Sequence, residues 1–278
     1  MPVIDAHAHF WRRPATPRDA GGPVPDDQEI SVDGLVALAT SAGVDHIVHI
    51  TRGVMGYDNR FSIAEAARHP DTVRVLCRFD PRPADIPGRL DALLAEPGVV
   101  GLRVYDPPPD DVWLTDGTLE PVFAACEERD VPIGVYAPGR AAVLREIARR
   151  HPGLTLIADH LALSVLHSVA PAARVDGWAD VLALEAQANV VLKVSGLPEV
   201  TQEAFPFPRA QSLLHEVYDT FGASRLMWGS NFPPIGRVCT YAAALDLVRS
   251  ACDFIPEADR AEILGGTAAR VFGGRWSG

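Results

Sequence analysis

Two histidines, one residue apart, stand at the end of the first apolar run, in VIDAHAHFW at residues 3–11. In a β-strand the side chains at i and i+2 share one face, so Asp5, His7 and His9 are expected to line up together. Two imidazoles placed in this way can chelate one metal ion or hold one substrate carboxylate. The HxH pattern also arises by chance, so its meaning depends on where this segment ends in the fold.

Other residues with useful chemistry follow later apolar runs. His160 ends LTLIADH and is expected to face a site, whereas its neighbour Asp159 should point toward the helices. Arg103 ends VVGLRVY, and its guanidinium can clamp a carboxylate through two hydrogen bonds. The alternatives are a satisfied core histidine for His160 and a surface salt bridge for Arg103.

The only lysine in the chain, Lys193, alternates with Ser195 along VVLKVSG, so both can face inward. An unpaired buried charge is costly, and Lys193 would therefore need an anionic partner or substrate. Asn231 ends LMWGSN; its amide can donate or accept a hydrogen bond but cannot take up a proton. Three further residues near strand ends are candidates for substrate binding, namely Arg52, Arg78 and Tyr136.

The elements that position these residues alternate regularly along the chain. Strands are predicted at 3–9, 46–51, 73–79, 99–105, 132–137, 154–160, 190–196 and 226–230. Helices are predicted at 33–43, 59–69, 86–95, 118–130, 140–151, 176–187, 208–221, 240–251 and 256–272. Eight strand–helix repeats predict a (β/α)8 TIM barrel, a single α/β domain over 1–278, with its site at the C-terminal strand ends. An open doubly wound sheet is the rival fold, but no GxGxxG turn follows the first strand.

Composition narrows the classes of function. Hydrophobic residues make up 47% of the 278 residues, which supports a large core, and the net charge of −11 disfavours nucleic-acid binding. No apolar run is long enough to cross a membrane, and the N-terminus lacks the pattern of a signal peptide. Four scattered cysteines favour reduced thiols, so a cytoplasmic location is expected. The oligomeric state, a homo-oligomer included, stays open.

Taken together, these segments resemble the amidohydrolase superfamily, in particular the branch with 2-pyrone-4,6-dicarboxylate lactonase and the sugar-acid lactonases. The resemblance covers nearly the whole chain through VIDAHAHFW, GYDN, GLRVYD, DHLA, KVSG, GSNFPP and ILGGTAARVF. It implies a distorted barrel in which His7, His9 and His160 surround the substrate or a single metal ion. It also implies that Arg103 binds substrate, and that the reaction opens a lactone.

The sequence departs from that family at three positions. The strand-five histidine of many metal-dependent relatives is absent, since PIGVYAPG offers only Tyr136. Arg103 replaces the strand-four lysine that bridges two metal ions, which argues against a binuclear centre. The strand-eight aspartate, which in the family receives the proton of the attacking water, is Asn231 here. His160, another histidine or a loop carboxylate such as Asp106 would then have to act as the base.

The leading hypothesis is therefore a hydrolase that opens a cyclic ester of a small anionic molecule. A decarboxylase, lyase or isomerase on the same barrel is the first alternative, and a non-catalytic binding protein is the second. Whether the site binds a metal ion stays open as well. Three neutral imidazoles, His7, His9 and His160, could hold one zinc or manganese ion, but the lack of an anionic ligand favours a site that requires no cofactor.

Overall fold

The computed structural model describes residues 1–12, 30–105, 112–165 and 169–273. Eight strands form one parallel sheet in chain order: β1 (Ile4–Ala8), β2 (His46–Ile50), β3 (Val73–Arg78), β4 (Val99–Tyr105), β5 (Ile133–Tyr136), β6 (Leu156–Ala158), β7 (Val190–Ser195) and β8 (Leu226–Gly229). The first and last strands meet through backbone bonds from His9 N to Phe232 O and from Asn231 N to His7 O, both 2.8 Å. The sheet thus forms a nearly closed barrel, and the predicted (β/α)8 fold is confirmed.

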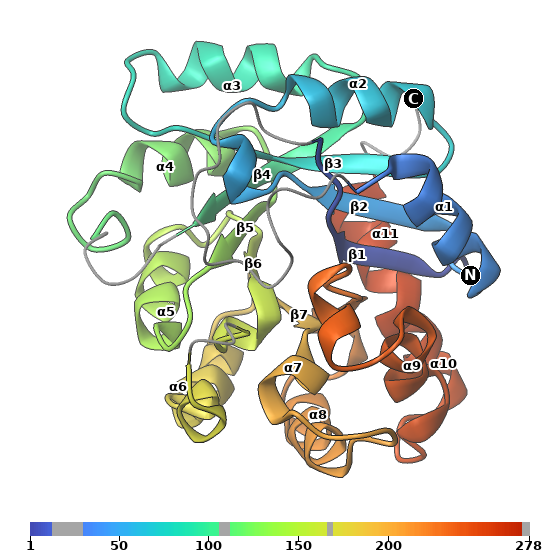
Figure 1. Cartoon of the computed structure of the whole chain (residues 1–278). Helices are drawn as coiled ribbons and strands as arrows, with labels where there is room; N and C mark the ends of the chain where they lie inside the picture. The colour runs from blue at the N-terminus through green and yellow to red at the C-terminus, as the bar shows by residue number, and fades with distance from the viewer. Residues whose placement is uncertain (13–29, 106–111, 166–168, 274–278) are drawn as a thin grey trace.

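Helices surround the strands (Figure 1). They are α1 (Val32–Ser41), α2 (Arg60–Arg68), α3 (Ile86–Leu94), α4 (Glu120–Glu128), α5 (Ala141–Arg150), α6 (Trp178–Leu182), α7 (Leu197–Thr201), α8 (Pro208–Phe221), α9 (Tyr241–Asp246), α10 (Glu257–Ala261) and α11 (Thr267–Phe272). Helix α7 was not predicted. A π-helical turn at Leu247–Ala251 forms the end of the helix predicted at 240–251, and a second one at Glu262–Gly266 interrupts the helix predicted at 256–272. In the described part of the chain, no helix has the length and apolar character to cross a membrane.

Apolar residues pack in two layers on either side of the strands. The larger cluster lies between strands and helices, where alternating strand residues such as Val73, Val75 and Cys77 meet the helices. The smaller cluster fills the barrel interior and includes residues of the last helix; its buried members are Ile4, Ala6, Val48, Ile50, Leu76, Val100, Ile157, Val191, Met227, Ala268 and Phe272. Helix α11 therefore packs against the interior core, which leaves the C-terminal strand ends for polar side chains.

Candidate active site

The two histidines of β1 face the barrel interior at its C-terminal end. The pairing of β1 with β2 shifts register between Asp5 and Ala8, and this irregularity turns His7 and His9 inward after Ile4 and Ala6. His7 Nε2 and His9 Nε2 lie 3.3 Å apart. Burial and the neighbouring positive groups hold the pKa of both rings well below the usual value, so both are neutral at pH 7.

Asp5 does not join the two histidines, contrary to the expected alignment. Its carboxylate accepts hydrogen bonds from the backbone N–H groups of Ser230 (2.8 Å) and His7 (3.0 Å) and from the Tyr241 hydroxyl (2.9 Å). The shift of register in β1 separates it from the interior face. Asp5 thus links β1 to the end of β8 by hydrogen bonds and stabilises the backbone next to the site.

Asp159 is the centre of the site, although the sequence placed it against the helices. Ile157 faces the interior, and Asp159, two residues later, keeps that direction. Its Oδ2 accepts from Arg103 Nε at 2.9 Å, and its Oδ1 lies 3.1 Å from Lys193 Nζ and 3.6 Å from His7 Nδ1. Burial alone would raise the Asp159 pKa, but the charges of Lys193 and Arg103 hold it well below its usual value. The carboxylate therefore stays ionised.

His160 reaches the same site because the backbone turns sharply after Asp159. Strand β6 ends at Ala158, and His160, Leu161 and Ala162 all have positive φ, of 54°, 57° and 54°. This left-handed region is unfavourable for residues other than glycine, and here it lets two consecutive side chains enter one site. His160 Nδ1 lies 2.8 Å from Ser195 Oγ, and its ring centroid is 4.4 Å from that of His7. Burial lowers the His160 pKa to about 4, so the ring is neutral at pH 7.

Lys193 and Ser195 follow the interior-facing Val191 on β7, as the alternation predicted. Lys193 is completely buried, and Asp159 is the anionic partner that the sequence required of it. Burial lowers the Lys193 pKa, while Asp159 opposes this effect. The cost of removing each charge from water is offset by the opposite charge beside it.

Arginine and tyrosine side chains line the neighbouring part of the barrel mouth. The Arg103 guanidinium lies 5.7 Å from the ring centroids of both Tyr105 and Tyr136, which stack on each other at 5.3 Å. Tyr136 also meets His160 edge to face, with centroids 5.5 Å apart. This aromatic contact and the bond to Asp159 fix the plane of the Arg103 guanidinium.

Arg52 and Arg78 extend this positive region. Arg52 follows β2 and lies over the Trp11 ring at 4.4 Å, close enough to His9 to help lower its pKa. Arg78 ends β3 and donates to the carbonyl oxygens of Gly53 (3.2 Å) and Gly56 (3.1 Å). Burial and then Arg103 lower the Arg78 pKa. Three guanidinium groups thus lie around the same end of the barrel.

Asn231 forms a side-chain hydrogen bond with a glutamate that was not predicted from the sequence to belong to the site. Its backbone has φ 56°, and its side-chain Nδ2 donates to Glu199 Oε2 at 2.5 Å. Glu199 lies in α7, directly after β7, and is completely buried. Burial raises its pKa to about 8. The signal that could have revealed Glu199 is a lone acidic residue in the apolar stretch GLPEV, three residues after the strand-ending glycine.

A comparison with protein-family models matches the amidohydrolase family over residues 4–274, almost the entire chain. The chain belongs to the amidohydrolase family. The site of this amidohydrolase lies at the C-terminal strand ends, where that fold carries its catalytic groups, so the resemblance inferred from the sequence is confirmed.

Three similar proteins illustrate the match. An L-fucono-1,5-lactonase of Burkholderia ambifaria is 31% identical over 283 residues, which cover 97% of this chain and 94% of that protein. An amidohydrolase structure from Burkholderia multivorans with bound zinc has a TM-score of 0.84 at 24% identity, covering 98% and 99% of the two chains. A structure named as a 2-pyrone-4,6-dicarboxylic acid hydrolase, from Pseudomonas putida, has a TM-score of 0.79 at 22% identity, covering 98% and 97%. At these identities the two structures support the fold alone.

The histidine pair of this amidohydrolase fits a metal ion in part. His9 Nδ1 lies 2.9 Å from the Ile50 carbonyl oxygen, which can only accept, so His9 Nε2 carries a lone pair. The carboxylate of Asp159 near His7 Nδ1 favours the same tautomer there. Two lone pairs 3.3 Å apart suit one zinc ion, because Zn–N bonds of about 2.0–2.1 Å at a tetrahedral angle span that distance.

A third ligand is not in place, however. Among residues 1–12, 30–105, 112–165 and 169–273, no group of three or more His, Cys, Asp or Glu side chains is arranged to hold a metal ion. His160 directs its Nδ1 to Ser195 instead. His7 and His9 would thus offer two nitrogen ligands to a metal ion, and the expectation that no cofactor is required stays a prediction.

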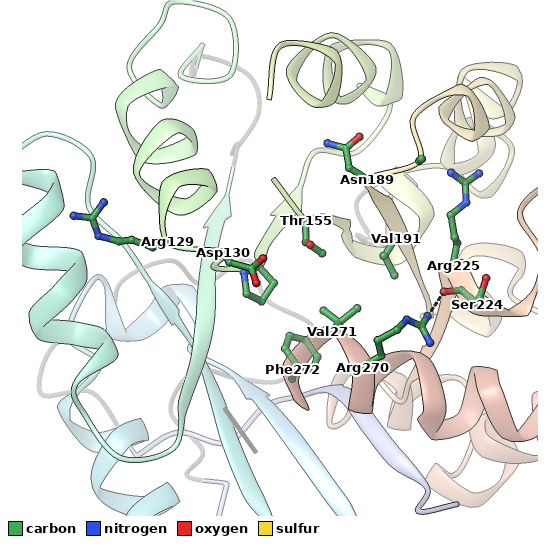
Figure 2. A pocket seen from close by; sticks show the side chains of 12 residues that line it. Arg129, Asp130, Thr155, Asn189, Val191, Ser224, Arg225, Arg270, Val271 and Phe272 are labelled. Carbon is green, nitrogen blue, oxygen red and sulfur yellow. Dashed lines mark hydrogen bonds between the residues drawn. The ribbon is translucent and has the colours of Figure 1, made fainter. Parts of the chain in front are cut away.

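Other residues lie away from this site. His49 stacks on Phe10 at 3.6 Å in the layer between strands and helices and bonds to Ser62, and Asp106 falls outside the described residues. A cavity of about 760 Å³ is at the opposite end of the barrel. Figure 2 shows its lining by residues that precede β6, β7 and β8, such as Thr155 and Asn189, and by α11. In a barrel of this type that face serves stability rather than catalysis.

Proposed function

We propose that this amidohydrolase opens the ring of a lactone carried by a small, anionic molecule, through attack of water on the ester carbonyl. The observation that carries the proposal is the arrangement of cations around neutral imidazoles at one barrel mouth. Arg103 and Lys193 bind Asp159, while Arg52 and Arg78 lie on the side of β2 and β3. The similarity to a curated L-fucono-1,5-lactonase supports the lactone as the substrate class.

The arginines give the site its preference for an anionic substrate. Arg103 is only 8% exposed, so a carboxylate that reaches it leaves water and gains a strong, charge-assisted interaction. Arg52 and Arg78 are more exposed and suit a second polar group of the substrate. An ester without a carboxylate would lack the charge-assisted interaction with Arg103, and we propose that such esters are poor substrates.

The same positive groups assist the chemical step. As water attacks, the carbonyl oxygen gains negative charge, and preorganised cations in a site with little water stabilise that charge. Neutral His7 and His9 add no repulsive charge of like sign to Arg103, and they remain available as hydrogen-bond acceptors. A divalent ion, when held by His7 and His9, would supply Lewis acidity to the carbonyl oxygen.

The experiment is a panel of lactones with and without a carboxylate, assayed by proton release. We expect turnover of carboxylated sugar-acid lactones and much slower turnover of lactones without a carboxylate. We expect Arg103→Gln to lose most of this turnover while Arg149→Gln, at an exposed arginine on α5, keeps it. Carbon dioxide release from carboxylic acids in place of proton release would instead support a decarboxylase. Ligand binding without any turnover would support a binding protein.

Four free cysteines support a reducing, cytoplasmic location as a further proposal.

A further inference from the structure

Hydrolysis of an ester by water needs a group that takes a proton from the water as the new C–O bond forms. Asp159 is poorly suited to that task, because Arg103 and Lys193 bind its carboxylate and hold its pKa low. Asp5 bonds to Ser230, His7 and Tyr241 behind the strands. Of the described carboxyl groups that are buried at this end of the barrel, only Glu199 remains.

Glu199 lies at the mouth of the barrel because α7 follows β7 at once. Gly196, in the left-handed region with φ 67°, makes the turn, and an ideal Cβ placed on it would be 3.3 Å from both Glu199 Oε2 and His160 Nδ1. The carboxyl group and the His160 imidazole thus flank the same glycine. On the other side, Glu199 Oε2 accepts from Asn231 Nδ2, on the loop after β8.

A purely structural role explains the amide contact but not the carboxyl group. Burying a titratable carboxyl costs free energy, and a glutamine at 199 would bond to Asn231 without that cost. The charged groups near Glu199 come from several elements: Arg174 donates to its backbone oxygen and, with Arg237, lowers its pKa, while His160 and Cys239 lie nearby. Burial outweighs both arginines, and the pKa of about 8 suits a group that gains and loses a proton near neutral pH.

We propose that Glu199, held in place by Asn231, is the proton acceptor of the hydrolytic step, an inference that rests on the proposed lactone hydrolysis. The water oxygen bonds to the carbonyl carbon, and one water proton passes to the Glu199 carboxylate. The ring C–O bond then breaks, its electron pair stays on the departing oxygen, and the proton from Glu199 neutralises that alkoxide. The product is the open hydroxy acid, and Glu199 is again a carboxylate.

The decisive experiment exchanges the two side chains of this pair. Glu199→Gln keeps the shape and removes the carboxylate, and we expect kcat to fall by about 10²–10⁴-fold with KM changed by less than about threefold. The double variant Glu199→Gln with Asn231→Asp returns one carboxylate to the same hydrogen bond from the opposite side. We expect it to recover at least about tenfold over Glu199→Gln, with the low-pH limb of the kcat profile moved to a new position. The matched control is Glu185→Gln, at an exposed glutamate before β7, which should keep wild-type rates.

Each outcome decides one question. If the wild type opens a lactone and Glu199→Gln keeps at least a third of its kcat with the same pH profile, the role of Glu199 is refuted while lactone hydrolysis stands. A loss in Glu199→Gln with no recovery in the exchanged pair, although circular dichroism shows both variants folded, also refutes it. If the wild type opens no lactone on the panel, both proposals fail together.

Discussion

Removing the carboxylate at the centre of the site should weaken the whole barrel, and Asp159→Asn is the perturbation that tests this. Asp159 and Lys193 are both fully buried, with Oδ1 and Nζ 3.1 Å apart, and Arg103 adds a 2.9 Å bond to Oδ2. The variant keeps the shape but leaves the lysine charge buried without its anion. Breaking a buried pair in this way costs about 3–5 kcal/mol.

The measurement is urea unfolding at pH 7, followed by circular dichroism, together with the thermal midpoint. A loss of about 3–5 kcal/mol corresponds to a fall in Tm of roughly 6–15 °C for a chain of this size. Asp219→Asn is the control, because its pair with His215 is exposed and should change stability by less than about 0.5 kcal/mol.

A second substitution tests the cause of the loss. Lys193→Met in the Asp159→Asn background removes the unpaired charge, so we expect it to recover about half of the lost stability or more. The reasoning is refuted if Asp159→Asn loses less than about 1 kcal/mol, or if Lys193→Met adds a further loss in that background.

Three further changes probe separate parts of the site. Arg103→Lys keeps the charge but loses the planar bond to Asp159, and kcat/KM should fall by about 10²-fold or more; a fall below fivefold would contradict the proposed clamp. Zinc added to metal-free protein should fill one weak site, seen by calorimetry, and His9→Ala should abolish it; near-stoichiometric zinc in protein purified without added metal would contradict the two-ligand site. The folded pKa of Glu199 is raised to about 8, so its protonated form stabilises the fold at low pH and this stability is lost as pH rises through about 8. Glu199→Gln should flatten that fall in unfolding free energy between about pH 5 and 8, and an unchanged slope would contradict burial as its cause.

The sequence predicted the barrel well because the repeat of strands and helices is a periodic signal. The strand ranges matched closely except at β6, which the structure ends at Ala158 instead of residue 160. The candidates His7, His9, Arg103, His160 and Lys193 converge in the structure, since strand ends of a barrel meet at one face.

The errors about which side chains face the site have a common origin: at single residues the backbone departs from regular strand alternation. Strict alternation predicted that Asp5 faces the site and Asp159 does not, and both predictions were wrong. The register shift in β1 and the left-handed turn at His160 each reverse the expected face, and neither has a sequence signal. Glu199 escaped notice because a glutamate in the first turn of a short helix is ordinarily a surface residue.

The way α11 packs under the strands has a consequence for how the protein is made. Ala268 and Phe272 complete the interior core, and β1 must find β8, more than two hundred residues later, before the cylinder closes. During translation the first strands therefore remain unpaired at one edge, and their interior-facing apolar side chains stay exposed, until nearly the whole chain has been synthesised. Contacts of such long sequence separation form slowly, and the exposed early strands are prone to self-association. Expression yield should thus depend on chaperone supply and growth temperature more than the stability of the finished barrel suggests.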